Sequence, residues 1–204
     1  EWRFGEVTGF TNPLESEHDS FVLGHTGTSI SLACGLAKTR DMQHTAAGAS
    51  EIGNVIAIIG DGSLSSAIAF EGLNNAAEQG GNLIIVVNDN EMSIAEDFGG
   101  MYGNLARLRA SNGTAELNLF KAFGLDYRYV EQGNDVDTLV AALEDLKDID
   151  HPVVLHIHTT KGLGFSDETE AQDGSDGCNQ TNPQPHAGQC EANHWQDPDS
   201  ALGK

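Results

Sequence analysis

The sequence has few basic residues and no long apolar run. It contains 10 Lys and Arg against 31 Asp and Glu, which gives a formal net charge of -21. That charge repels a phosphate backbone and argues against nucleic acid as a partner. The longest apolar runs, at residues 55–59 and 83–87, are strand-sized and far short of the roughly 20 residues that a membrane helix needs. We therefore expect neither a nucleic-acid partner nor a membrane segment.

Cysteine is scarce as well, and the first residues do not resemble a leader. Cys34, Cys178 and Cys190 lack paired metal-type spacing, so we expect reduced thiols and a cytoplasmic location. Residues 1–4 do not show the basic region and apolar stretch of a signal peptide. Because the sequence begins with Glu and not with Met, we expect a piece of a longer chain.

The apolar pattern divides the chain into one α/β domain and a tail. Predicted strands lie at residues 54–59, 83–87, 126–130 and 153–159, and predicted helices lie at 26–42, 63–78, within 91–112, at 115–123 and at 135–146. This alternation predicts a doubly wound parallel sheet flanked by helices, with ligands at the carboxyl ends of the strands. The continuous apolar character of residues 54–59 predicts a strand that is covered on both faces. The last of these helices is amphipathic, with an apolar stripe of Val136, Leu139, Val140, Leu143 and Leu146.

The tail has a different composition from the domain. Residues 166–204 are rich in Asp, Glu, Gly, Gln and Pro, and their sequence lacks a sustained apolar face. We predict a domain over residues 1–165 and an acidic loop or linker over residues 166–204.

Two polar motifs follow neighbouring predicted strands. Gly60-Asp61-Gly62 ends the first strand, and Asn88-Asp89-Asn90 ends the second, so one helical crossover separates Asp61 from Asn90. Carboxylate, amide and main-chain carbonyl oxygens are the ligands that Mg²⁺ prefers, which makes Asp61, Asn90 and the carbonyl of Met92 candidates. Asp61 could instead be a helix N-cap, and Asn88 and Asn90 could be turn residues.

Two histidines lie on one predicted strand. His156 and His158 are two residues apart and should point to the same face of that strand. They resemble a metal pair, but no third ligand is evident in the sequence, so a metal site there is disfavoured.

The motifs and their surroundings resemble 1-deoxy-D-xylulose-5-phosphate synthases, a branch of the thiamine-diphosphate enzymes. The matching blocks keep their order from about residue 9 to residue 165. They are Glu15-Ser-Glu-His-Asp-Ser-Phe21, Gly24-His25-Thr26, Thr28-Ser-Ile-Ser31, Val55-Ile-Ala-Ile-Ile-Gly-Asp-Gly62, Phe70-Glu-Gly-Leu-Asn74, Asn88-Asp-Asn-Glu-Met-Ser-Ile94, Leu155-His156, Lys161-Gly162 and Gly164. The resemblance implies a thiamine-diphosphate-binding fold, with thiamine diphosphate and Mg²⁺ as cofactors.

The resemblance also implies roles for particular residues. It assigns Mg²⁺ to Asp61, Asn90 and the Met92 carbonyl, and cofactor contacts to Gly24, His25, Thr26, Gly62, Ser63, Asn90 and Phe165. His25, which follows Gly24 at an expected strand end, is the candidate for assisting proton transfer. Phe165 stands where these synthases usually have Tyr, so a hydroxyl-mediated contact is absent there.

The implied reaction joins pyruvate to glyceraldehyde 3-phosphate with loss of CO₂, in isoprenoid and thiamine precursor synthesis. The resemblance also implies that the family's N-terminal segment and its second, pyrimidine-binding domain are missing from this sequence. We therefore expect a homodimer in the complete enzyme and no activity from this chain alone. The alternatives are a transketolase N-terminal domain, which shares the metal motif, and a non-catalytic split cofactor-binding subunit that needs a partner chain.

Overall fold

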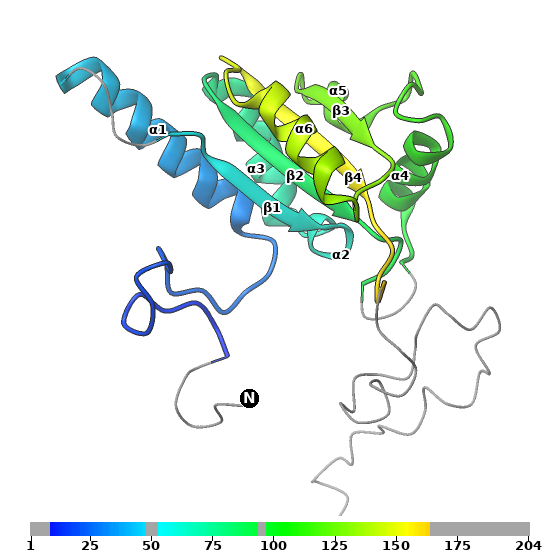
Figure 1. Ribbon diagram of the computed structural model, residues 1–204, viewed down its shortest axis with the longest axis horizontal. Coiled ribbons are helices and arrows are strands. Elements are labelled where there is room, and N and C mark those ends of the chain that lie inside the picture. Colours follow the sequence, from blue (N-terminus) through cyan, green and yellow to red (C-terminus); the bar gives the residue numbers. More distant parts are fainter. Residues whose placement is uncertain (1–8, 48–52, 94–96, 164–204) are drawn as a thin grey trace, which may run out of the picture.

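Four parallel strands form the centre of the fold. The computed structural model describes residues 9–47, 53–93 and 97–163, so Phe165 and the predicted linker at 166–204 lie outside it. The strands lie side by side in the order β1-β2-β4-β3 (Figure 1). Their bounds are β1 Ile56–Gly60, β2 Leu83–Asp89, β3 Asp126–Val130 and β4 Pro152–His158.

Helices lie on both faces of this sheet. Their bounds are α1 Ser29–Ala47, α2 Asp61–Leu64, α3 Ala67–Gln79, α4 Gly100–Ala110, α5 Leu119–Ala122 and α6 Val136–Leu146. In Figure 1, α6 crosses the front of the sheet, and α1, α3 and α4 lie behind it. This arrangement confirms the predicted doubly wound α/β fold. Within the described ranges, no helix combines the length and apolarity needed to cross a membrane.

The alternating side chains of β2 divide the core into two layers. Leu83, Ile85 and Val87 pack in the larger cluster, together with residues of α1, α3 and α4. Ile84 and Val86 face the other way and pack in the smaller cluster with α6. Because both faces of β2 are buried, its unbroken apolar sequence has a direct structural cause.

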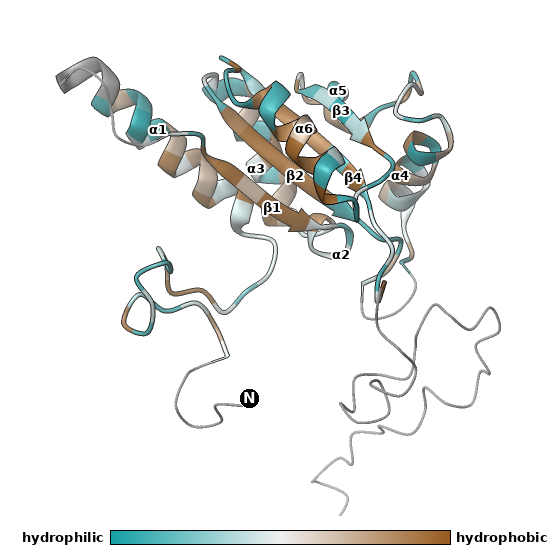
Figure 2. Ribbon diagram, viewed as in Figure 1, coloured by the Kyte–Doolittle hydropathy of each residue, from teal (hydrophilic) through white to brown (hydrophobic). Residues whose placement is uncertain are grey.

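The front face of β1 differs from the prediction. Ile56 and Ile58 are 44% and 66% exposed, so the expectation that residues 54–59 are covered on both faces was wrong. β1 is an edge strand of the described sheet, and α6 packs on the cluster formed by β2 and β4 instead. A groove of about 310 Å³ separates β1 from α6, and the hydropathy colouring shows apolar residues on both elements (Figure 2).

The apolar stripe predicted on residues 135–146 is only partly buried. Leu146 is buried and Leu139 and Leu143 pack against the smaller cluster, but Val136 and Val140 are 69% and 54% exposed. Helical periodicity located the stripe correctly. It could not show that α6 packs against β2 and β4 and not against β1.

The helix predicted over residues 63–78 is two helices. α2 ends at Leu64, and α3 begins after Ser66, whose side chain accepts a hydrogen bond from the N–H of Ala69. The hydroxyl of Ser65 donates to the carbonyl of Gly62 at 2.8 Å. These serine side chains satisfy backbone groups locally, which favours a helix boundary over a continuous helix.

Asn118 is expected to make a measurable contribution to stability through α5. Its side-chain oxygen accepts hydrogen bonds from the N–H groups of Phe120 and Lys121 at 2.9 and 3.1 Å, and the residue is buried. Asn118→Ala should lower the free energy of unfolding by about 1–2 kcal/mol in urea denaturation. The matched control is Leu117→Ala, which changes a neighbouring side chain that is 63% exposed. Equal losses in the two variants would contradict the capping role.

Candidate functional site

The two polar motifs meet at the carboxyl edge of the sheet. β1 and β2 are parallel neighbours, with Gly60 opposite Asn88. The N–H of Asn90 donates to Asp61 Oδ2 at 3.0 Å, and the N–H of Gly62 donates to Asp61 Oδ1 at 2.8 Å. The structure thus brings Asp61 and Asn90 together, as the crossover spacing indicated. Asp61 is the first residue of α2 and Gly60 is its N-cap, so the capping alternative for Asp61 was wrong.

Asp61 is a buried acid in an acidic setting. Burial raises its pKa to about 6, against the lowering effect of the N–H groups of Gly62 and Asn90, and the carboxylates of Asp89 and Asp97 raise it further. Among the ion pairs of the described residues, none includes Asp61. Each carboxylate oxygen accepts one backbone bond and keeps a further lone pair. Such a carboxylate suits a hard divalent cation, whose charge would offset the cost of burial.

Asn90 and Met92 lie in a tight turn after β2. The N–H of Met92 donates to Asn90 Oδ1 at 3.2 Å, while Glu91 between them has a φ of +67°. The turn alternative for Asn90 is therefore confirmed. A turn hydrogen bond does not by itself prevent an amide oxygen from binding a cation, because such an oxygen has two lone pairs. Asn88 has a structural contact, since the hydroxyl of Thr159 donates to its Oδ1 at 2.6 Å.

Gly62 and Ser63 lie between the loop that contains Ser93 and the loop that contains Gly27. A Cβ built on Gly62 would stand 2.6 Å from the Cβ of Ser93, so only glycine permits this approach. A Cβ on Gly27, whose φ is +86°, would stand 3.3 Å from the carbonyl of Ser63. The segment that follows Gly24, His25 and Thr26 is therefore packed against α2, next to the metal-site candidates.

His25 is exposed and lies in a turn. Its Nδ1 is 2.6 Å from the carbonyl oxygen of Thr26. Because a carbonyl only accepts, Nδ1 carries the proton, and the lone pair of a neutral ring is on Nε2. That tautomer suits a group that exchanges a proton through Nε2. The strand expected before His25 was wrong, since in the described residues the first strand begins at Ile56.

Several polar residues near this edge were not singled out from the sequence. Asp97 Oδ2 is buried without a hydrogen-bond partner in the described structure, and its carboxylate raises the pKa of Asp61. Arg109 on α4 pairs with Asp89, a fully buried carboxylate at the end of β2. Burial raises the pKa of Asp89, but hydrogen bonds from His156 and Arg109 and the charge of Arg109 outweigh it and lower the pKa to about 2. Spacing gave no signal for Asp97 or Arg109, because folding brings both to the site from beyond β2.

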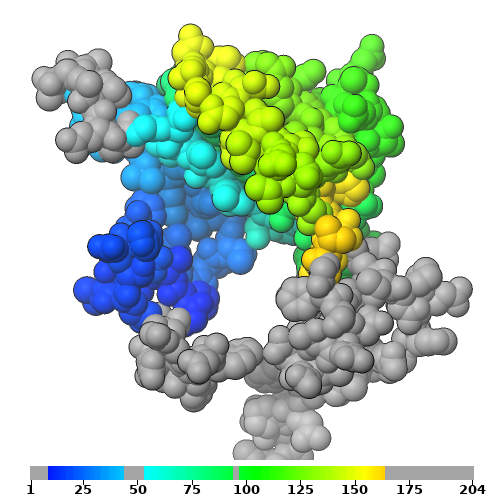
Figure 3. Space-filling view, viewed as in Figure 1, coloured from blue at the N-terminus to red at the C-terminus, as the bar shows by residue number. Residues whose placement is uncertain are grey.

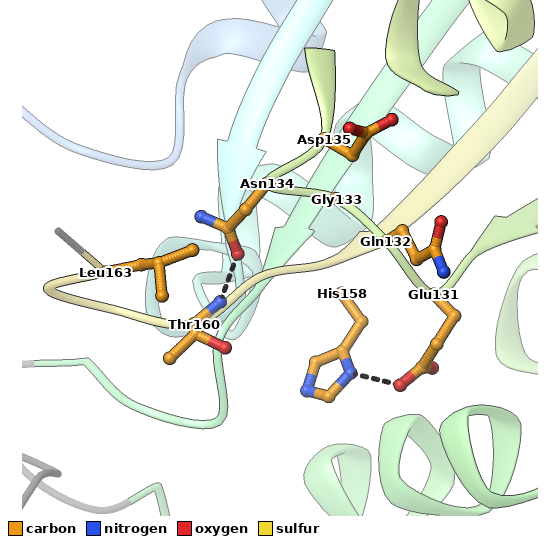
Figure 4. Close-up of a pocket in the computed structure, with 8 residues that line it drawn as sticks. All are labelled: Glu131, Gln132, Gly133, Asn134, Asp135, His158, Thr160 and Leu163. Atoms are coloured by element: carbon orange, nitrogen blue, oxygen red, sulfur yellow. Dashed lines mark hydrogen bonds and ion pairs between the residues drawn. The ribbon is translucent and has the colours of Figure 1, made fainter. Parts of the chain in front are cut away.

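A polar pocket of about 470 Å³ lies at the ends of β3 and β4. Figure 4 shows His158 and Glu131 facing one another, with 3.1 Å between Nδ1 and Oε1, and Thr160 donating its N–H to Asn134. The other ring nitrogen of His158 is 3.1 Å from Glu91. Of the predicted cofactor and metal residues that lie within the described ranges, none lines this pocket. Its lining residue His158 thus contacts Glu91, which follows the metal-site candidate Asn90 in the sequence.

The segment before α1 stands apart from the sheet. Figure 3 shows this segment, in dark blue, extending from the rest of the molecule. It is held by its own contacts, including the N–H of Asn12 donating to Asp19 at 2.8 Å, and its side chains of Phe10, Leu14 and Val22 are exposed. His25 lies where this segment leads into α1.

Two solved structures with a similar fold are transketolases. The enzyme from Campylobacter jejuni matches with a TM-score of 0.54 and 22% identity, over 71% of this chain and 22% of that one. A transketolase from Pichia stipitis matches with a TM-score of 0.53 and 23% identity, over 70% and 21% of the two chains. These likenesses establish the fold.

Sequence comparison identifies the branch. A family profile described as 1-deoxy-D-xylulose-5-phosphate synthase matches residues 3–118 and 110–159. The synthase of Parabacteroides distasonis is 35% identical in an alignment that covers 83% of this chain and 32% of the relative. That of Alcanivorax borkumensis is 33% identical in an alignment that covers 89% of this chain and 32% of the relative. The chain spans about a third of the length of these relatives, and it belongs to the 1-deoxy-D-xylulose-5-phosphate synthase family.

Proposed function

We propose that this chain provides the Mg²⁺ and diphosphate site of a thiamine-diphosphate-dependent transferase. The complete enzyme would join pyruvate to glyceraldehyde 3-phosphate with loss of CO₂, as a homodimer in isoprenoid precursor synthesis. The observation that carries the proposal is the buried Asp61 carboxylate, which lies beside Asn90 and has no ion-pair partner among the described residues. A buried charge of this kind needs a compensating cation.

The residues of this chain bind and orient in the proposed reaction. Asp61, the Asn90 amide oxygen and the Met92 carbonyl would hold Mg²⁺, and Gly62 and Ser63 would contact the diphosphate. Thiamine diphosphate, when bound, supplies the electron sink for decarboxylation. The loop of Gly24, His25 and Thr26 would lie on the other side of the cofactor, with Phe165 as a further proposed contact.

His25 is proposed to move a proton near the substrate. Its Nδ1 is engaged by the carbonyl of Thr26, which leaves Nε2 as the basic atom. The chain spans about a third of the length of the relatives described above, so the proposal concerns the complete enzyme.

The test is an assay of the complete protein that contains this chain. With Mg²⁺, thiamine diphosphate and glyceraldehyde 3-phosphate, we expect CO₂ release from pyruvate and no turnover of a ketose-phosphate donor. A transketolase would give the opposite preference. The parallel measurement is calorimetric binding of thiamine diphosphate with and without Mg²⁺. Turnover of the ketose phosphate with no CO₂ from pyruvate would refute the synthase proposal.

A further inference from the structure

A fully buried histidine lies beneath the candidate metal site. His156 on β4 is 0% exposed and is surrounded by aromatic rings. Their centroids lie 5.2 to 6.2 Å from that of the imidazole, and they belong to Phe120, Tyr127 and Tyr129. An apolar side chain would fill this space without a desolvation cost, so the polar ring needs a reason.

Both ring nitrogens of His156 are hydrogen-bonded. Nε2 is 2.9 Å from Asp89 Oδ2, and Nδ1 is 2.7 Å from the hydroxyl of Tyr127. A carboxylate only accepts, so Nε2 donates to Asp89, while Nδ1 is hydrogen-bonded to the hydroxyl of Tyr127. Burial, followed by the charge of Asp89, raises the pKa of Tyr127 and keeps its hydroxyl protonated. The series Tyr127–His156–Asp89 is therefore fully bonded across three strands.

Asp89 connects His156 to the turn after β2 through its hydrogen bonds. Its Oδ2 also accepts from Arg109, and its Oδ1 accepts from the N–H of Glu91 at 3.1 Å. Glu91 has a φ of +67°, a left-handed conformation that is unfavourable for a side chain such as Glu. The surrounding contacts must hold it there, and the Asp89 carboxylate provides one of them directly.

Other bonds from β4 and the turn after it reach the same segment. The N–H of Thr159 donates to the carbonyl of Asp89 at 2.9 Å, and Lys161 Nζ donates to the carbonyl of Ser93 at 2.7 Å. We call residues 88–93 the 88–93 loop. It carries Asn90 and Met92, so its shape decides where the two candidate oxygen ligands lie relative to Asp61.

We propose that His156 is a positioning residue, which orients the Asp89 carboxylate and thereby holds the 88–93 loop in the shape that binds Mg²⁺. The predicted effect of His156 on Mg²⁺ binding rests on the proposed function. Its effect on the shape of the 88–93 loop does not, because that effect requires no ligand. The two parts are therefore measured separately.

The experiment uses two substitutions that keep opposite ends of the imidazole. In the complete protein, His156→Gln keeps an amide N–H near the position of Nε2, within reach of Asp89. His156→Asn keeps one near Nδ1 and cannot reach Asp89. We expect the Mg²⁺ concentration for half-maximal thiamine-diphosphate binding to rise about 10- to 100-fold in His156→Asn, and no more than about 3-fold in His156→Gln.

Hydrogen exchange provides a readout without ligand. In metal-free protein, amides of the 88–93 loop should exchange about tenfold faster in His156→Asn than in His156→Gln. If His156→Asn does not fold, His156→Leu takes its place, because it also lacks the donor and has a similar size. The matched packing control is Val154→Ala, at a buried position of the same strand. It should lower the melting temperature and leave both the Mg²⁺ requirement and exchange of the loop unchanged.

The outcomes separate the two proposals. If the wild-type protein shows no Mg²⁺-dependent binding of thiamine diphosphate, the proposed function fails, and hydrogen exchange still decides the positioning role. The positioning role is overturned if His156→Asn and His156→Gln behave alike in both measurements. It is also overturned if His156→Asn merely lowers the melting temperature as Val154→Ala does.

Discussion

Asp61→Ala is expected to abolish Mg²⁺-dependent binding of thiamine diphosphate by the complete protein. The carboxylate lies beside Asn90 at the shared edge of β1 and β2, and its two oxygens are held by backbone N–H groups. Loss of a group that only orients a metal ligand commonly weakens binding by about 10- to 100-fold. Loss of a ligand itself should weaken binding by at least about 100-fold, which titration calorimetry would record as a missing heat signal.

The matched control for this substitution is Asp145→Ala. Asp145 is exposed on α6, and the change removes the same charge from the protein. It should leave the affinity for Mg²⁺ and thiamine diphosphate unchanged. Unchanged affinity in Asp61→Ala as well would remove Asp61 from the metal site, and with it the main support for the proposed function.

The sequence predicted the part of the site that depends on neighbouring strands. Residues 83–87 are an unbroken apolar run, and the structure buries them on both faces of the sheet. Because a parallel strand follows its neighbour after one helical crossover, the motifs that hold Asp61 and Asn90 had to reach the same edge. The 3.0 Å contact between them follows from this topology. The fold and the location of the candidate site could therefore be predicted together.

Contacts between side chains that are far apart in the sequence could not be predicted. The strand period placed His156 and His158 on one face, but it did not give their partners. Asp89 is 67 residues away from His156 in sequence, and Tyr127 is 29 residues away. A metal pair was considered for these histidines because they share a face of one strand, and it was disfavoured because no third ligand was evident in the sequence. Within the described residues no cluster of metal-ligating side chains forms around them, and His156 bonds instead to a carboxylate and a phenol.

The exposure of one face of β1 could not be predicted for the same reason, because it depends on how distant elements pack together. Apolar residues at 55–59 indicate that a surface can be buried, but they do not say which element covers it. In the described chain, α6 packs on β2 and β4, and Ile58 remains exposed. Local pattern thus located each element, and the packing of one element on another had to come from the structure.

Asp61→Asn should stabilise the metal-free protein and remove its stabilisation by ligand. The native pKa of Asp61, about 6, lies above the unfolded value of 3.8. The native state therefore binds the proton more tightly, and the contribution of Asp61 to stability falls as the pH rises from about 4 to above 6. At pH 8 the ionised carboxylate costs about 3 kcal/mol, taking 1.36 kcal/mol for each pH unit between the two pKa values.

The asparagine side chain removes the charge but loses an acceptor. Its single oxygen can accept from the N–H of Gly62 or of Asn90, and the bond that is lost costs about 1 kcal/mol. We therefore expect Asp61→Asn to be more stable than the wild type by about 2 kcal/mol at pH 8 in EDTA. The difference should shrink toward pH 4, where the wild-type carboxyl is protonated. Urea denaturation at a series of pH values measures it.

Ligand should reverse this order of stability. Saturating Mg²⁺ and thiamine diphosphate, at about 1,000 times the dissociation constant, would add about 4 kcal/mol to the wild type and nothing to a variant that does not bind them. The wild type should then be the more stable protein. If Asp61→Asn were less stable than the wild type in EDTA at pH 8, the buried carboxylate would be a structural group that stabilises the fold. A reversal on adding ligand would instead show that its burial is a cost, which the bound cation offsets.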